Sequence, residues 1–174
     1  MSQETPRLPE LPVVEPPAES AEEVVARLGM VPIPEEGGYY VAGPRTQQLN
    51  GITVLLTDGA AGFSAMHRLA VDEGWQWLGG APVALLRLRP GGSGVLNYVG
   101  QEHSQVLVRR GTWMGASPLG YWTLLACWCS PAFRPEHFEL GEREALTADY
   151  PEFATEIAAL TRDRPVGRMR PEGT

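Results

Sequence analysis

Between residues 51 and 130 the sequence is a series of short apolar segments separated by turn residues. Segments of this length at near-regular spacing are typical of the strands of a β-sandwich or barrel. The chain contains 20 glycines and 16 prolines, which supports many turns and few long helices. We expect an all-β fold with minor α content, and strands at residues 39–41, 52–56, 64–69, 74–78, 82–88, 95–99, 104–108 and 121–129.

Helical signals flank this β region on both sides. Ser20 and Glu23 form a capping-box pattern before an apolar face, and Gly29 can end that helix. A second helical stretch covers residues 142–160, and Tyr150-Pro151 is expected to divide it. We expect residues 1–19, which are rich in Pro and Glu, to be a disordered arm and residues 162–174 a flexible tail. Residues 20–161 would then form a single domain.

Charge and composition exclude several classes of function. The net charge of -7 argues against binding to a nucleic-acid backbone. All 14 basic residues are arginine, so Schiff-base chemistry on a lysine is excluded. Neither a signal-peptide pattern nor a membrane-length apolar run occurs, which predicts a cytoplasmic protein with no membrane partner. Cys127 and Cys129, two residues apart on one strand, are expected to stay unpaired thiols.

Three blocks of the sequence together resemble a known family. They are Pro34-Glu35-Glu36-Gly37-Gly38-Tyr39-Tyr40 with Arg45-Thr46, then His67-Arg68 with Glu73-Gly74-Trp75-Gln76-Trp77, then Gln105 to Val108 with Gly111-Thr112-Trp113 and Phe133. Their order and spacing resemble the cupin_5 group (DUF985) of the RmlC-like cupin superfamily, over residues 21–161. The resemblance implies a cupin double-stranded β-helix, a jelly-roll barrel with short N-terminal and C-terminal helices. It also implies a homodimer, for which the strand at residues 39–41 is a plausible element.

The resemblance raises the question of a metal site. Metal-binding cupins offer His-x-His, a Glu a few residues on, and a further His on a later strand. Here His67 and Glu73 stand at two of these positions, while Leu69 and Met114 stand at the other two. Divalent transition metals need several imidazole or carboxylate donors that converge. We therefore expect neither a bound metal nor another cofactor.

His67 and Glu73 are the candidate catalytic residues. Alternate residues of a strand share a face, so Glu73, Trp75 and Trp77 point the same way. A carboxylate among indole rings is poorly solvated, so its pKa should rise toward the range useful for acid–base catalysis. Equally open for Glu73 is a structural role as a hydrogen-bond acceptor.

Other polar and aromatic residues are candidates for ligand binding. Trp75, Trp77 and Trp113 could form a stacking wall or belong to the core. Arg45 could bind a carboxylate or phosphate, or form a structural ion pair. Tyr40 could be an acid–base phenol or an ordinary barrel tyrosine, and Gln105 could orient a ligand or pair with neighbouring backbone. Gln76 and Phe133 complete the predicted ligand-binding set.

Two functions of different class follow. The first is a metal-independent isomerase, epimerase, dehydratase or cyclase that acts on a sugar nucleotide, a nucleoside or a secondary metabolite. The second is a non-catalytic cupin that binds a small ligand through the same residues. A metal-dependent dioxygenase is a weaker alternative. The enzyme hypothesis requires His67 and Glu73 to point into one open cavity, within hydrogen-bond reach of a common point. It fails if Arg68 or another side chain fills that space.

Overall fold

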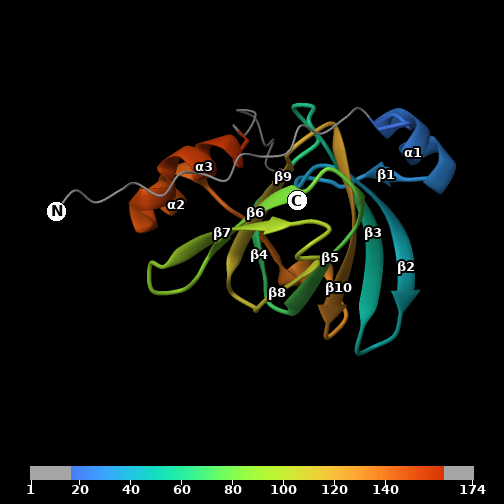
Figure 1. The fold of residues 1–174 in the computed structure, drawn as a ribbon. Coiled ribbons are helices and arrows are strands. Elements are labelled where there is room, and N and C mark those ends of the chain that lie inside the picture. Colours follow the sequence, from blue (N-terminus) through green and yellow to red (C-terminus); the bar gives the residue numbers. More distant parts are fainter. Residues whose placement is uncertain (1–16, 163–174) are drawn as a thin grey trace, which may run out of the picture.

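The chain folds into two antiparallel β-sheets, described by a computed structural model over residues 17–162 (Figure 1). The six-stranded sheet has the order β1 (Val31–Pro32), β2 (Tyr39–Arg45), β3 (Asn50–Thr57), β10 (Trp122–Ser130), β5 (Asp72–Gly80), β8 (Gln105–Val108). The five-stranded sheet has the order β11 (Phe138–Leu140), β4 (Ser64–Leu69), β9 (Trp113–Pro118), β6 (Val83–Leu88), β7 (Gly94–Val99). The chain crosses repeatedly between the sheets, which agrees with a jelly roll and confirms the expected fold class.

The core lies between the inner faces of the two sheets. Inward-facing residues alternate with outward-facing ones, as Thr123, Leu125, Cys127 and Cys129 do along β10. Leu85 of the five-stranded sheet and Leu125 of the six-stranded sheet are both fully buried in this cluster. Burial of a leucine side chain contributes roughly 1.5–3 kcal/mol, so this cluster holds the sheets together.

Short helices cover the outer faces of the sheets (Figure 1). Helix α1 (Ala21–Leu28) has the predicted capping box between Ser20 and Glu23, and Gly29 ends it with φ +61. Its Val24 packs on Leu55 of β3. Helices α2 (Arg143–Asp149) and α3 (Ala154–Ala159), with the 3₁₀ turn η2 (Pro151–Phe153) between them, cover the five-stranded sheet. A further 3₁₀ turn, η1 (Pro135–His137), precedes β11.

Three strands were not among the expected ones: β1, β9 and β11. Strand β9 carries Gly115 and Pro118, which are poor strand formers. Gly115 is needed there because a Cβ atom would lie 2.6 Å from the Met66 sulfur on β4. The close approach of β4 and β9 therefore selects a residue that weakens the local strand signal.

The ends of the described region are packed. Glu19 forms an ion pair with Arg27, and its backbone carbonyl accepts the indole N–H of Trp122. Arg162 is half-buried and donates hydrogen bonds to two backbone carbonyls. The rest of the predicted arm and tail, residues 1–16 and 163–174, lies outside the described residues.

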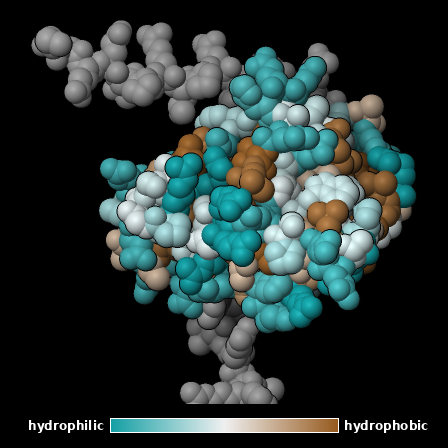
Figure 2. All heavy atoms as spheres, turned by 90° about the horizontal axis from the view of Figure 1, so that it is seen from below, coloured by the Kyte–Doolittle hydropathy of each residue, from teal (hydrophilic) through white to brown (hydrophobic). Residues whose placement is uncertain are grey.

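The surface of the folded body is mixed in character. Hydrophobic residues form separate patches among hydrophilic ones on the face shown in Figure 2. Within residues 17–162, no helix has the length and apolar character needed to cross a membrane.

Candidate functional site

A cavity of about 580 Å³ is lined by residues of both sheets. Its walls come from β2, β3, β4, β5, β10 and β11 and from the segments before β2 and after β10. The predicted site residues that line it are His67, Glu73, Tyr40, Arg45 and Phe133. Arg68 points to the other side of β4, where it pairs with Glu139 and lies over Trp113. His67 and Glu73 therefore meet the first requirement of the enzyme hypothesis, a shared open cavity.

His67 is held in a fixed orientation on β4. Its ring is buried and stacks on Phe138, with ring centroids 5.4 Å apart. Its Nδ1 lies 2.8 Å from the backbone carbonyl of Ala65. A carbonyl oxygen only accepts hydrogen bonds, so Nδ1 carries a proton, and in the neutral form of the ring Nε2 is the nitrogen that has the lone pair. This tautomer leaves Nε2 as a base.

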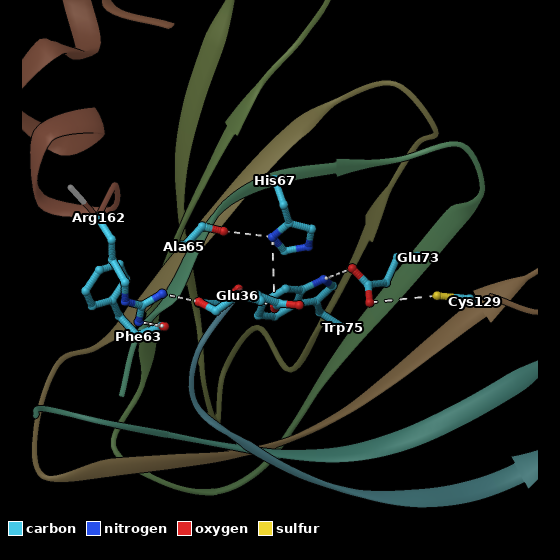
Figure 3. Close-up of polar contacts among 9 residues, drawn as sticks. Glu36, Phe63, Ala65, His67, Glu73, Trp75, Cys129 and Arg162 are labelled. Atoms are coloured by element: carbon cyan, nitrogen blue, oxygen red, sulfur yellow. Dashed lines mark hydrogen bonds and ion pairs between the residues drawn. The ribbon is translucent and has the colours of Figure 1, made fainter. Parts of the chain in front are cut away.

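Glu73 comes from β5, where it pairs with Cys129 of β10 and Val108 of β8. Its Oε2 accepts the indole N–H of Trp75 at 2.9 Å, and its Oε1 accepts the thiol of Cys129 at 3.8 Å (Figure 3). Burial raises the pKa of Glu73 to about 7, although the charge of His67 and the two hydrogen bonds lower it. Near neutral pH this carboxyl is therefore populated in both its protonated and its ionised form.

Glu36 is a cavity residue that the sequence reasoning missed. It lies in the loop between β1 and β2, and its Oε1 is 3.9 Å from Nδ1 of His67. The same oxygen accepts the hydroxyl of Ser64 at 2.6 Å. The negative charge of Glu36 also raises the pKa of Glu73. The available signal was its place in the block that carries the family resemblance, two acidic residues followed by Gly37-Gly38.

The remaining predicted residues in the cavity form its walls and rim. Tyr40 on β2 and Phe133 after β10 pack against the core. Arg45 is exposed and its Nη2 donates to the backbone carbonyl of Phe133 at 2.8 Å. Thus Arg45 supports the loop that closes one side of the cavity and also places a cation on the cavity lining.

The structure places the predicted tryptophans outside the cavity lining. Trp75 is buried in the core and donates its indole N–H to Glu73. Trp77 is half-buried and donates to the carbonyl of Ala81 at 3.2 Å. Trp113 faces the C-terminal helices instead. The predicted stacking wall of tryptophans is thus corrected: the aromatic residues of the cavity are Tyr40, Phe133 and Phe138.

Gln76 and Gln105 are also away from the cavity. They are paired neighbours on β5 and β8, and Gln105 is exposed. Gln76 alternates with Trp75 and Trp77, which belong to the inner side, so it faces outward.

The cavity also contains two free thiols, Cys127 and Cys129. Burial, together with the nearby charge of Glu73, raises the pKa of both thiols above the usual range. They are therefore protonated at neutral pH and are poor nucleophiles.

The donor set does not fit the metal site of a metal-binding cupin. Nδ1 of His67 is engaged by Ala65, and both oxygens of Glu73 accept hydrogen bonds. Leu69 and Met114 occupy the other two positions and offer no imidazole. Over residues 17–162, no three His, Cys, Asp or Glu side chains are placed to hold a metal ion.

Comparison with known proteins agrees with this fold. The family model of the cupin superfamily described as Cupin_5 (DUF985) matches residues 22–141. None of the curated proteins matches the sequence. Among solved structures, a structural-genomics protein from Shewanella oneidensis has 28% identity and a TM-score of 0.78, over 84% of this chain and 99% of its own. A hypothetical protein from Leishmania major has 25% identity and a TM-score of 0.74, over 83% of this chain and 100% of its own.

A more distant neighbour shares the fold alone. Oxalate decarboxylase from Bacillus subtilis has 14% identity and a TM-score of 0.55, over 83% of this chain and 42% of its own. The cupin fold therefore includes enzymes among its members, but the reaction is decided by the residues of each site. Because the family model matches residues 22–141, the chain belongs to the cupin_5 (DUF985) family of the cupin superfamily.

Proposed function

We propose that this protein is a metal-independent acid–base enzyme of the isomerase or lyase type. The supporting observation is that a fixed imidazole and a carboxyl with a pKa of about 7 line the same cavity of about 580 Å³. Cavities of this size bury most of a small organic molecule. The proposed substrate is a sugar nucleotide, a nucleoside or a secondary metabolite.

Each residue has a defined part in the proposed reaction. Nε2 of His67 removes a proton from the substrate, because Nδ1 is already bound to Ala65. Glu73 is protonated in a large share of molecules near pH 7 and returns a proton to another substrate atom. This transfer suits epimerisation, isomerisation, dehydration or cyclisation, in which no electrons are exchanged with a cofactor. Arg45 would hold a carboxylate or phosphate of the substrate at the rim.

The test begins with a thermal-shift screen of metabolites on the native protein. A ligand at a hundred times its Kd stabilises the folded state by about 2.7 kcal/mol, which is several degrees in Tm. Each hit is then incubated in D₂O and followed by mass spectrometry and NMR. The native protein should convert the hit or exchange one carbon-bound proton for deuterium. His67→Gln and Glu73→Gln should lose that activity.

Matched controls come from the loop between β7 and β8, where His103 and Glu102 are exposed. His103→Gln and Glu102→Gln should keep full activity. A hit that is exchanged equally by the native protein and by Glu73→Gln would contradict the assignment of Glu73.

A non-catalytic binding cupin is the second candidate. The observation in its favour is that both oxygens of Glu73 already accept hydrogen bonds from protein groups. In that case, hits would stabilise the native protein but show neither conversion nor deuterium exchange. The same screen therefore separates the two functions.

A homodimer is part of the proposal, as family resemblance implies. Leu78 on β5 and Leu107 on β8 are exposed on the outer side of the six-stranded sheet, by 46% and 53%. Apolar side chains on an open sheet face suit a contact between copies. Size-exclusion chromatography with light scattering should give twice the 18.9 kDa mass of the chain. A mass of one chain would contradict the dimer.

A further inference from the structure

The end of the described chain reaches back to the cavity through Arg162. This residue lies beyond residues 22–141, the region that the family model matches. Its Nη2 donates to the backbone carbonyl of Phe63 at 2.8 Å, and its Nη1 donates to the backbone carbonyl of Glu36. The guanidinium also lies 3.9 Å above the ring of Phe63. A planar guanidinium can make both hydrogen bonds and the ring contact at once.

These contacts hold Glu36 from its backbone side (Figure 3). The carbonyl of Glu36 also accepts the N–H of Ala65 at 2.9 Å, which joins the loop to β4. The next residue, Gly37, has φ +98, and a Cβ atom there would collide with the Arg162 guanidinium. The carboxylate end of Glu36 is held by the hydroxyl of Ser64 at 2.6 Å. Glu36 is thus fixed at both ends, by Arg162 and by Ser64.

We propose that Arg162 is a positioning residue that holds the Glu36 carboxylate beside His67 and thereby sets the charge balance of the cavity. The proposal rests on the acid–base function proposed above. It assigns no contact with the substrate to Arg162. The residue that acts on the catalytic pair is Glu36, whose Oε1 is 3.9 Å from Nδ1 of His67.

The pKa of Glu73 is sensitive to the position of Glu36, because charged and polar groups surround Glu73 from several elements. His67 faces it from β4, Glu36 from the β1–β2 loop, Trp75 from β5 and Cys129 from β10, with Cys127 next to Cys129. Arg45 and Glu35 also line the cavity. Among the carboxylates, Glu36 is the one that raises the pKa of Glu73. Moving Glu36 away should therefore lower that pKa.

The sign of the effect distinguishes two routes from Arg162 to Glu73. Removal of a positive charge acting directly on Glu73 would raise its pKa, because the ionised carboxylate would lose a favourable interaction. Displacement of Glu36 would lower it, because a repulsive negative charge would leave. The proposal predicts the second sign.

The test is an NMR titration of the Glu73 side-chain carboxyl in ligand-free protein labelled with ¹³C at glutamate Cδ. The Glu73 signal is assigned by its absence from Glu73→Gln. Arg162→Gln and Glu36→Gln should each move the Glu73 midpoint to lower pH than in the native protein. In the double variant, Arg162→Gln should add no further shift to Glu36→Gln, because it acts through that carboxylate.

Two further variants keep the result interpretable. Arg162→Lys keeps the charge but loses the fork that reaches both carbonyls, so a smaller shift of the same sign is expected. Arg27→Gln removes an arginine that pairs with Glu19 far from the cavity and should leave the midpoint unchanged. If Arg162→Gln does not fold, Arg162→Lys decides the sign.

Three outcomes would overturn the proposal: an unchanged midpoint in both Arg162 variants, a midpoint moved to higher pH, or an equal shift by Arg162→Gln with and without Glu36. The titration is made without substrate. Its result therefore does not depend on whether the cavity converts a metabolite. Failure of the proposed role of Arg162 can thus be distinguished from failure of the proposed acid–base function.

Discussion

Glu73→Gln should change how the stability of this protein depends on pH. Gln has nearly the size of Glu but cannot ionise, and its amide oxygen can still accept the indole N–H of Trp75. In the native protein, burial raises the pKa of Glu73 from 4.5 to about 7. The folded state therefore keeps its proton on Glu73 over a pH range in which the unfolded chain has already released it.

The sign and the size of the effect follow from linkage. Below both pKa values, Glu73 is protonated in both states and adds no pH dependence. As pH rises from 4.5 through about 7, only the unfolded state gains from ionisation, so the native protein loses stability. Each unit between the two pKa values corresponds to about 1.4 kcal/mol, so the full loss is about 3 kcal/mol above pH ~8. The Glu73→Gln variant should not lose stability in this way, because glutamine does not ionise.

The measurement is the free energy of unfolding in urea, followed by tryptophan fluorescence at a series of pH values from ~4 to ~8. The quantity of interest is the difference between variant and native protein, in which the titration of remote groups cancels. This difference should move in favour of Glu73→Gln by about 3 kcal/mol across the range. Parallel pH profiles would refute the reasoning, and with it the main support for Glu73 as a proton donor at neutral pH.

Three more outcomes can be checked on the same protein. Trp75→Phe removes a hydrogen bond that lowers the pKa of Glu73, so the Glu73 midpoint in an NMR titration should move to higher pH. Cys127 and Cys129 should react with a thiol reagent in urea but only slowly in the folded protein at pH ~8, because burial keeps them protonated. Gly37→Ala should lose about 1–3 kcal/mol of stability in urea unfolding, since φ +98 and the Arg162 guanidinium both exclude a side chain.

Local signals in the sequence predicted most of the framework. The Ser20–Glu23 capping box is observed, and Pro151 separates two helical segments as expected. Strand alternation correctly placed Glu73 and Trp75 on the same inner face. These features depend on neighbours within a few residues, which is why a single sequence can predict them.

The composition of the cavity depends on contacts between distant segments. Glu36 and His67 are separated in the chain, and they meet because Ala65 donates its N–H to the Glu36 carbonyl. No periodicity in either segment indicates that contact. Gln76 was predicted to bind a ligand, but its alternation with Trp75 already indicates that it lies on the outer face of the sheet. For Gln105, the run Val106-Leu107-Val108 is apolar on both faces, so alternation gave no direction.

The C-terminal helices and the cavity are connected through strand β4. Met66 faces the helices and is fully buried under them, while the next residue, His67, faces the cavity. The backbone of Met66 is bound on both sides, by the Leu160 carbonyl at 2.8 Å and by the N–H of Gly141 at 2.7 Å. The segment after α3 thus contacts both sides of the cavity. Leu160 holds β4, the strand that carries His67, and Arg162 holds the loop that carries Glu36. Loss of α3 packing should therefore disturb both sides of the proposed acid–base pair together, although no residue of that helix lines the cavity.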